Sequence, residues 1–342
     1  METFLGTDSR QARFQVSEST QVAAVRRAAS DLATRLGFGE TCAGQAAIVA
    51  TEAATNIVKH ALHGEILLRP LRCGEQRGIE LIAIDAGPGM GNLASSMRDG
   101  TSTTGTYGGG LGAMHRLSQE FDIYTAPGKG TVLGMTLWAD GVMPPASNLL
   151  HGVVCQPIPG ETECGDAWSI AAGATSGLVL LADGLGHGPL AAQASERAAL
   201  VLSTHQDYPV AALLEESHEA LRGSRGAAVS VARIDTLSGQ LLYAGVGNIA
   251  AHVYNWDGTG RRQLVSHNGI VGSNLRKVQE FATPWPSGSN LVLHSDGLAT
   301  RWDLSEYPGI FQCHPRVIAA LLYRDFTRGR DDVSVVVVRD HC

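Results

Sequence analysis

Apolar residues recur with a helical period early in the chain and with a strand-like period later in its first half. Val22, Val25, Ala29, Leu32 and Leu36 fall on one helical face, and a glycine follows them. A second helix is expected over about residues 41–62. The first half also contains β-like runs at 14–16, 65–71, 79–84, 121–125 and 131–138.

The periodic pattern stops between residues 139 and 159, a stretch that contains four prolines. We therefore expect a first domain over 1–140, a linker over 141–159 and a second domain over 160–342. The second half predicts helices at 189–203, 210–221 and 315–323, and strands at 167–172, 178–182, 228–234, 240–245, 249–254, 291–294 and 333–338.

Composition narrows the class of protein. The chain has 342 residues, of which 44% are hydrophobic and 17% charged, as in globular proteins with room for two cores. The formal charge of -7 disfavours nucleic acid as a partner. There is no apolar run of about 18 residues and no apolar signal core, so neither a membrane span nor a leader is expected. The six scattered cysteines indicate reduced thiols in a cytoplasmic protein.

The second expected helix carries a polar stripe. Glu52, Asn56 and Lys59 lie at positions i, i+4 and i+7, which places them on one face of an α-helix. An amide and a carboxylate stacked in this way can hold magnesium and orient a nucleophile. A solvated polar face remains the alternative interpretation of this element alone.

Two glycine-rich segments follow the stripe. In the first, an apolar strand runs into Asp85, with Gly87 and Gly89 behind it; the carboxylate suits the amine of adenine, although a simple turn has the same pattern. In the second, glycines at 108–110 and 112 open a helix whose amide groups suit phosphate. Residues 98–106 are rich in Gly, Ser and Thr and are expected to form a lid.

Together and in this order, the three elements resemble the N, G1 and G2 boxes of the GHKL ATPases, and most nearly the RsbT-like serine kinases and anti-sigma kinases. The resemblance implies that Glu52 is the catalytic base and that Asn56 binds magnesium. It also implies that Asp85, supported by Thr131, recognises adenine. The full nucleotide set that it implies is Asn56, Lys59, Asp85, Gly87, Gly89, Gly108, Gly110, Leu111, Gly112 and Thr131.

Acidic residues stand where apolar strands meet loops in the second half. Asp166 precedes a strand, Asp183 and Asp296 each end one, and Asp331 comes just before the last. One Asp-Gly pair is usually a turn, but four such positions predict a common edge that holds hard divalent cations. Two cations would activate water for hydrolysis of a phosphate ester without a protein nucleophile. Cys164 is followed by no phosphate-binding Cys-x5-Arg loop, so a cysteine phosphatase is disfavoured.

This half resembles the PPM phosphatases of the SpoIIE type, over roughly residues 155–339. The resemblance implies manganese or magnesium ligands at Asp166, Asp183, the Gly184 carbonyl, Asp296 and Asp331, with Asp332 a neighbour easily confused with Asp331. His187 is expected to shape its loop, and the turn ending at Asn248 to be structural. The expected fold class is α+β: a GHKL two-layer sandwich followed by a PPM α/β/β/α sandwich.

The combined interpretation is a bifunctional enzyme. It would use ATP and magnesium to phosphorylate a serine or threonine on a STAS-domain regulator, act indirectly on a sigma factor, and remove the same phosphate with two manganese or magnesium ions. Two alternatives remain open at this stage. The first domain could sequester a partner without transferring phosphate, or it could serve only as an ATP sensor for the phosphatase.

Overall fold

The computed structural model describes residues 2–6, 10–93, 97, 110–145, 147–275 and 277–340. The chain divides into two compact units, which we call the N unit (Arg10–Pro145) and the C unit (Met1–Ser9 together with Ala146–Cys342). Each unit has its own core, and each is described below by itself.

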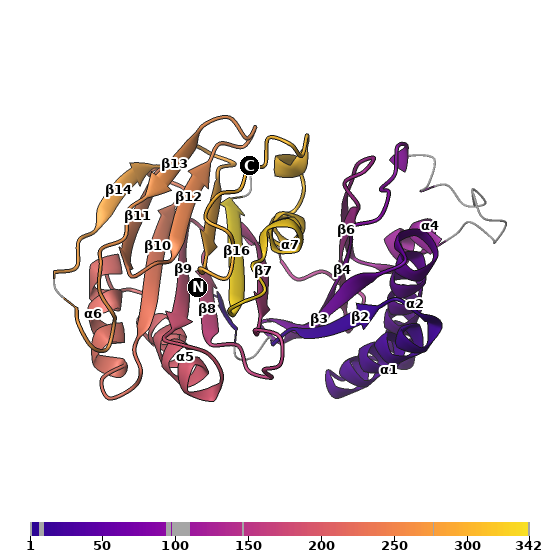
Figure 1. Ribbon diagram of the computed structural model, residues 1–342, viewed down its shortest axis with the longest axis horizontal. Coiled ribbons are helices and arrows are strands. Elements are labelled where there is room, and N and C mark those ends of the chain that lie inside the picture. Colours follow the sequence, from indigo (N-terminus) through magenta and orange to yellow (C-terminus); the bar gives the residue numbers. More distant parts are fainter. Residues whose placement is uncertain are drawn as a thin grey trace. The chain divides into compact units, whose positions relative to one another are not determined.

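The N unit is a two-layer sandwich of helices on one face of an antiparallel sheet (Figure 1). The strand order is β2-β3-β4-β6-β5. Its elements are β2 (Ala12–Val16), α1 (Ser19–Arg35), α2 (Glu40–Asn56), the π-helical turn η2 (Ile57–Ala61), β3 (Gly64–Cys73), β4 (Gln76–Asp85), α4 (Gly110–Leu117), β5 (Glu120–Thr125) and β6 (Thr131–Trp138).

Helix α1 shows how local sequence sets an element of this unit. The Gln21 side chain accepts a hydrogen bond from the backbone N–H of Glu18 at 3.0 Å, which satisfies a donor at the start of the helix. Gly37 follows the last turn with φ +78, a conformation that favours glycine. Val25 and Ala29 are buried in the core beneath the helix. The helical face expected from the sequence is therefore confirmed.

The C unit is a four-layer α/β/β/α sandwich. One sheet has the order β1-β8-β9-β10-β11-β14 and the other β13-β12-β15-β16-β7, and all their strand pairs are antiparallel. Its elements are β1 (Glu2–Leu5), β7 (Leu149–Gln156), β8 (Asp166–Ala172), β9 (Ser176–Gly184), α5 (Pro189–Thr204), α6 (Val210–Ala220), β10 (Ala227–Asp235), β11 (Gln240–Val246), β12 (Ala250–Tyr254), β13 (Arg261–Leu264), β14 (Phe281–Pro284), β15 (Asn290–His294), η3 (Ile310–Gln312), α7 (Pro315–Phe326) and β16 (Val333–Asp340).

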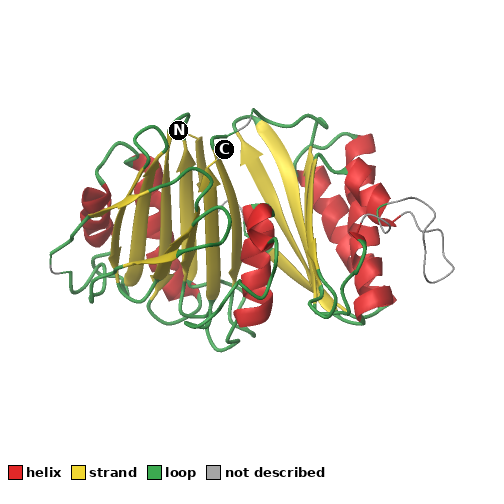
Figure 2. Ribbon diagram, turned by 90° about the horizontal axis from the view of Figure 1, so that it is seen from above, coloured by secondary structure: helices red, strands yellow, loops and turns green. Residues whose placement is uncertain are grey.

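Helices cover both outer faces of the two stacked sheets in the C unit. Helices α5 and α6 pack on the six-stranded sheet, and α7 packs on the five-stranded sheet (Figures 1 and 2). Strand β9 is consequently buried on both sides: Leu181 lies in the core between the sheets and Leu180 in the core under α5 and α6. This explains why its sequence is continuously apolar rather than alternating. The fold class expected from the sequence is confirmed.

The boundaries expected from the sequence are wrong at two places. Residues 2–5 were placed in the first domain, but β1 pairs with β8 of the C unit. Residues 149–156 were placed in the linker, but they form β7, which pairs with β16. The N unit is therefore inserted along the chain between two strands of the C unit.

No helix within the described ranges combines the length and the apolar character needed to cross a lipid bilayer.

Candidate active sites

Helix α2 brings two polar side chains to the start of α4 in the N unit. Glu52 and Asn56 are one turn apart on α2. A Cβ atom added at Gly110, the first residue of α4, would lie 2.7 Å from Glu52 Oε2 and 3.6 Å from Asn56 Oδ1. The carboxylate, the amide and the N-terminus of α4 therefore meet at one point, where they could bind a phosphate and its cation.

Asp85 is fixed at the end of β4 by backbone amides. Its Oδ1 accepts hydrogen bonds from the N–H groups of Gly87 at 2.8 Å and Thr131 at 3.2 Å. Thr131 is also its cross-strand neighbour on β6. The carboxylate is thus held at a strand end together with Thr131, and its role in an adenine site stays a prediction.

Close backbone approach explains the two glycines after Asp85. A Cβ atom at Gly87 would lie 2.8 Å from the Cβ atom of Ala61. Gly89 has φ +66 and faces the carbonyl oxygen of Ala126, which leaves no room for a side chain. These glycines let the loop after β4 lie against η2 and against the β5–β6 turn.

The structure differs from the sequence prediction at Lys59. The helix widens into the π turn η2 after Asn56, so Lys59 does not keep the α-helical register that would align it with Glu52 and Asn56. Lys59 is exposed on this turn. Leu111 and Gly112 are buried within α4. Gly108 and the expected lid at 98–106 lie outside the described residues.

In the C unit, the six-stranded sheet places two carboxylates side by side. Asp166 is the first residue of β8, and its cross-strand partner on β9 is Asp183. Gly184 follows at the end of β9 and donates its N–H to the carbonyl oxygen of Gly165 at 3.1 Å. These contacts set Asp166, Asp183 and Gly184 at the same end of the neighbouring strands β8 and β9.

The five-stranded sheet supplies the other two predicted acids. Asp296 follows β15 and Asp331 precedes β16, and these strands are antiparallel neighbours, so the end of one lies beside the start of the other. Asp296 and Asp331 line a cavity of about 410 Å³ together with Arg328 and Arg330. Acids from both sheets therefore stand at the same end of the sandwich.

Burial and mutual repulsion perturb these carboxyl groups. Burial raises the pKa of Asp166 to about 7, and the nearby Asp332 and Asp331 add to the rise. Burial raises the pKa of Asp183 to about 9, with further repulsion from Asp166, Asp296 and Asp331. Burial also raises the pKa of Asp296, and repulsion from the nearby Asp331 adds to the rise.

Repulsion of this kind is what a divalent cation relieves, and oxygen donors suit Mg²⁺ and Mn²⁺. The donor set therefore fits such ions. Among the described residues, however, no three His, Cys, Asp or Glu side chains are close enough together to enclose a metal ion.

Three residues hold the predicted acids or the loop beside them through hydrogen bonds, and they were not identified as site residues from the sequence. Ser295 donates to Asp166 Oδ2 at 2.7 Å and accepts the N–H of Ser334 at 2.9 Å. Asn248 donates its amide to Asp296 Oδ2 at 2.7 Å, so its role extends beyond the structural turn that we expected. The Gly-Asn turn and the Ser before Asp296 were visible in the sequence, but nothing local linked them to the acids.

Asp332, the third of these residues, is distinguished from Asp331 by its partners. Its two oxygens accept the N–H groups of Ile158 and Gly165, each at 2.8 Å, and the side chain is 3% exposed. Asp332 therefore anchors the loop before β8. Asp331 lines the cavity instead, and its role as a metal ligand stays a prediction.

His187 belongs to the loop after β9 and pairs with another loop. Its Nδ1 lies 2.9 Å from Glu161 Oε1, and both side chains are partly or largely exposed. This contact joins the loop after β9 to the loop before β8, in agreement with the expectation that His187 shapes its loop.

The raised pKa values predict how metal-free stability depends on pH. The folded chain holds the protons of Asp166 and Asp183 more tightly than the unfolded chain does. Their contribution to stability is therefore complete below the ordinary carboxyl pKa of about 4 and is lost as the pH rises through both raised values. We expect the melting temperature of the C unit in EDTA to fall between pH 5 and pH 9.

Thermal unfolding at several pH values in EDTA measures this dependence. The Asp183→Asn variant, which carries no charge at this position, should show a shallower fall than the wild type. Equal slopes for the two proteins would contradict the prediction. Added Mg²⁺ or Mn²⁺ should restore wild-type stability at high pH and have less effect on the variant.

Comparison with known proteins gives a separate match for each unit. A model of the histidine kinase-like ATPase domain matches residues 16–137, and a model of stage II sporulation protein E (SpoIIE) matches residues 174–341.

Two relatives from Bacillus subtilis (strain 168) match in the same way. The serine/threonine-protein kinase RsbT is 32% identical over 117 residues, which are 34% of this chain and 88% of RsbT. The phosphoserine phosphatase RsbX is 27% identical over 139 residues, which are 41% of this chain and 69% of RsbX. A crystal structure of RsbX in complex with magnesium superposes with a TM-score of 0.52 and 22% identity, covering 58% of this chain and 98% of that chain.

Proposed function

The chain belongs to the histidine kinase-like ATPase family through its N unit and to the SpoIIE family through its C unit, and from this premise we propose that it is a bifunctional signalling enzyme. The N unit transfers phosphate from ATP to a serine or threonine of a partner protein. The C unit is a phosphatase of the PPM type that removes the phosphate again. The observation that carries the proposal is the carboxylate cluster, by which we mean the four mutually repelling acids at strand ends of both sheets of the C unit: Asp166, Asp183, Asp296 and Asp331.

In the C unit, divalent cations supply positive charge for the substrate phosphate and lower the pKa of water. Asp166, Asp183 and the Gly184 carbonyl would hold these ions from one sheet, and Asp296 and Asp331 from the other. Ser295 keeps the Asp166 carboxylate oriented through a 2.7 Å hydrogen bond. No side chain has to form a covalent bond with the phosphate.

Charge around the cavity supports a phosphorylated substrate. Arg328 and Arg330 line the same cavity as Asp296 and Asp331. Both arginines are exposed, so their guanidinium groups can meet a phosphoserine on the surface of a folded partner. The proposed substrate is therefore a phosphoprotein.

In the N unit, we assign tasks in phosphoryl transfer to Glu52, Asn56, Asp85 and the N-terminus of α4. Asn56 would bind the magnesium of Mg-ATP, Asp85 would accept a hydrogen bond from the adenine amine, and the N-terminus of α4 would face the phosphates. Glu52 would take the proton from the substrate hydroxyl. The hydroxyl oxygen bonds to the γ-phosphorus as the bond to ADP breaks.

The partner that we propose is a STAS-domain regulator of a partner-switching system. The two relatives are a serine/threonine-protein kinase, RsbT, and a phosphoserine phosphatase, RsbX, whose named activities are opposed. A sigma factor would be affected only indirectly. Because the kinase reaction consumes ATP, we place the protein in the cytoplasm. Opposed activities on one chain require that they alternate, since simultaneous action would only hydrolyse ATP.

A transfer assay tests the whole proposal. The purified chain is mixed with Mg-ATP and a candidate STAS-domain protein, and the phosphorylated residue is mapped by mass spectrometry. Phosphate should appear on the partner and should disappear once ATP is exhausted and Mn²⁺ is added. If phosphate appears on the partner but is never removed, the phosphatase half of the proposal fails. If the chain never phosphorylates the partner but does remove phosphate from a partner that was phosphorylated beforehand, the kinase half fails.

Loss of the Asp85 carboxylate should weaken ATP binding. The Asp85→Asn variant replaces an acceptor oxygen by an amide donor, which opposes the adenine amine. We expect the dissociation constant for Mg-ATP to rise about 10- to 100-fold, the equivalent of one hydrogen bond to a charged group. Isothermal titration calorimetry measures this change.

A matched control for this variant is an acid just before the start of β4, the strand that ends at Asp85. Glu75 is exposed in the β3–β4 turn, and Glu75→Gln should bind Mg-ATP as the wild type does. Phosphatase activity of Asp85→Asn toward a small phosphate ester should be unchanged. Normal ATP affinity in Asp85→Asn would remove this residue from the nucleotide site.

A further inference from the structure

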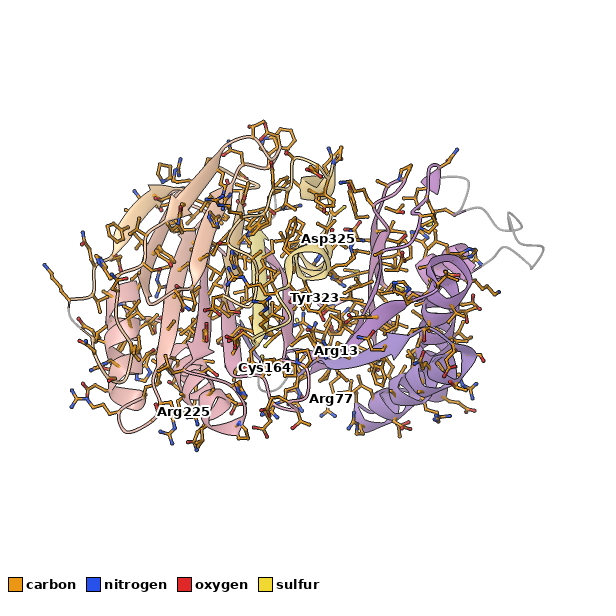
Figure 3. All side chains as sticks on the ribbon, viewed as in Figure 1. Arg13, Arg77, Cys164, Arg225, Tyr323 and Asp325 are labelled. Atoms are coloured by element: carbon orange, nitrogen blue, oxygen red, sulfur yellow. The ribbon has the colours of Figure 1, made fainter. Side chains whose placement is uncertain are left out.

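Two cysteine sulfurs are close neighbours beside the carboxylate cluster of the C unit. Cys155 lies on β7, and Cys164 lies in the loop before β8, where Figure 3 labels it. Their Sγ atoms are 3.5 Å apart. A disulfide has a sulfur–sulfur distance of about 2.05 Å, so the two atoms would have to approach by about 1.5 Å. Both residues are partly buried.

The pair is connected directly to Asp166. The Sγ atom of Cys155 lies 3.7 Å from the carbonyl oxygen of Asp166, and Cys164 precedes this residue by two positions. Asp332 holds the connecting loop through the N–H groups of Ile158 and Gly165. Because β7 is paired to β16 along its length, the loop, rather than the strand, has to move when the sulfurs approach.

We propose that Cys155 and Cys164 are a redox modification site: a peroxide joins them in a reversible disulfide that displaces Asp166 and weakens cation binding at the phosphatase site. The effect on catalysis rests on the proposed phosphatase function. The formation of the bond does not, because it depends only on the two sulfurs.

The chemistry balances with hydrogen peroxide as the oxidant. One sulfur attacks the peroxide, the O–O bond breaks, and a sulfenic acid and one water form. The second sulfur displaces the hydroxyl group of the sulfenic acid, which yields the S–S bond and a second water. The two sulfurs lose two electrons to the peroxide, and both thiol protons end in water. A dithiol reductant reverses the reaction by exchange.

The geometry lets either sulfur react first. The Sγ atoms of Cys155 and Cys164 are 3.5 Å apart, so a sulfenic acid formed on one of them lies within reach of the other, which resolves it across this gap.

Peptide mapping of the full-length protein tests the bond itself. The reduced chain is treated with hydrogen peroxide, the excess is removed with catalase, free thiols are alkylated, and the peptides are analysed by mass spectrometry. We expect a linked pair of peptides containing Cys155 and Cys164, and its loss after dithiothreitol. Thiols that remain alkylatable at both positions would show a simple packing contact and would overturn the proposal.

Binding of Mn²⁺ tests the consequence for the site. Calorimetry on the oxidised protein should give an affinity about tenfold or more below that of the reduced protein, the usual effect of disturbing the support of a metal ligand. Hydrolysis of p-nitrophenyl phosphate should fall in parallel and recover on reduction. A linked pair with unchanged Mn²⁺ affinity would contradict the proposed displacement of Asp166.

Three variants separate this pair from the other cysteines. Cys155→Ser and Cys164→Ser should each abolish the effect of peroxide on Mn²⁺ affinity. Cys313→Ser, at another partly buried cysteine of the C unit, should remain sensitive. If the reduced protein hydrolyses no phosphate ester, the proposed function fails, but mapping and Mn²⁺ binding still decide the disulfide.

Discussion

Replacing Asp183 by asparagine is expected to lower metal-dependent phosphatase activity about 1,000-fold, comparable to the loss of a principal electrostatic group from an active site. Asp183 pairs with Asp166 across β8 and β9 and faces the acids of the other sheet. An amide at this position carries no negative charge to hold a cation. Hydrolysis of a small phosphate ester with Mn²⁺, together with Mn²⁺ titration, measures the loss.

The same variant should be more stable than the wild type when no metal is present. At neutral pH and above, it removes the cost of either protonating this buried carboxyl group or burying its charge beside carboxylates that repel it, and such exchanges of function for stability are typically worth about 0.5–2 kcal/mol. Asp207→Asn, at an exposed acid of the same unit, should change neither property. An Asp183→Asn protein with normal turnover, or one less stable than the wild type in EDTA, would speak against the carboxylate cluster as a metal site.

Replacing Glu52 by glutamine is expected to lower phosphoryl transfer to the partner about 100- to 10,000-fold, the contribution of a general base. The side chain stays the same size beside Asn56 and the start of α4, so Mg-ATP binding should persist. Phosphosite mapping measures the transfer, and calorimetry measures the binding. The phosphatase reaction of this variant should equal that of the wild type.

A control on the same helix sharpens this experiment. Glu40 is exposed at the first residue of α2, and Glu40→Gln should transfer phosphate normally. Three readings of the N unit then give different results. A kinase loses transfer in Glu52→Gln only, whereas a sequestering module keeps its cellular effect in that variant. An ATP sensor shows no transfer even in the wild type, while Asp183→Asn still alters the phosphorylation of the partner.

Insertion of the N unit into the C unit bears on how the two proposed activities would alternate. The chain enters the N unit after β1, which pairs with β8, and leaves it before β7, which carries Cys155. The connection into the N unit starts from β1, the neighbour of the strand that begins at Asp166. The connection out of it leads to β7, where the Sγ atom of Cys155 lies near the Asp166 carbonyl oxygen. This connectivity gives a covalent route from one unit to the phosphatase site.

Most strands and helices could be predicted from local sequence, but four strands could not: β1, β7, β13 and β14. All four are edge strands of the C unit. An edge strand packs on fewer neighbours than a central one, so it tolerates polar residues and short length, as in Arg261–Leu264. Central strands such as β9 are buried on both faces, and their apolar runs were visible in the sequence.

The acids of the candidate site could be predicted from the sequence, but the residues that hold them through hydrogen bonds could not. Asp166, Asp183, Asp296 and Asp331 each adjoin an apolar strand, which is a local pattern. Their partners come from distant positions, as with Ser295, which is 129 residues from Asp166 along the chain. Likewise, nothing in the helical pattern of α2 indicated the π turn after Asn56.

The sequence by itself determined that two αβ domains are present and that acids stand at strand ends, and it placed Glu52, Asn56 and Asp85 in segments whose order resembles that of a nucleotide-binding family. Within each segment, the pattern depends on residues a few positions apart, whose periodicity and turn chemistry act locally. Only the tertiary structure decided which strands close the sheets, how strongly the acids repel one another, and that Cys155 meets Cys164. Those properties arise from pairing and burial between segments distant in the chain, and no local pattern encodes them.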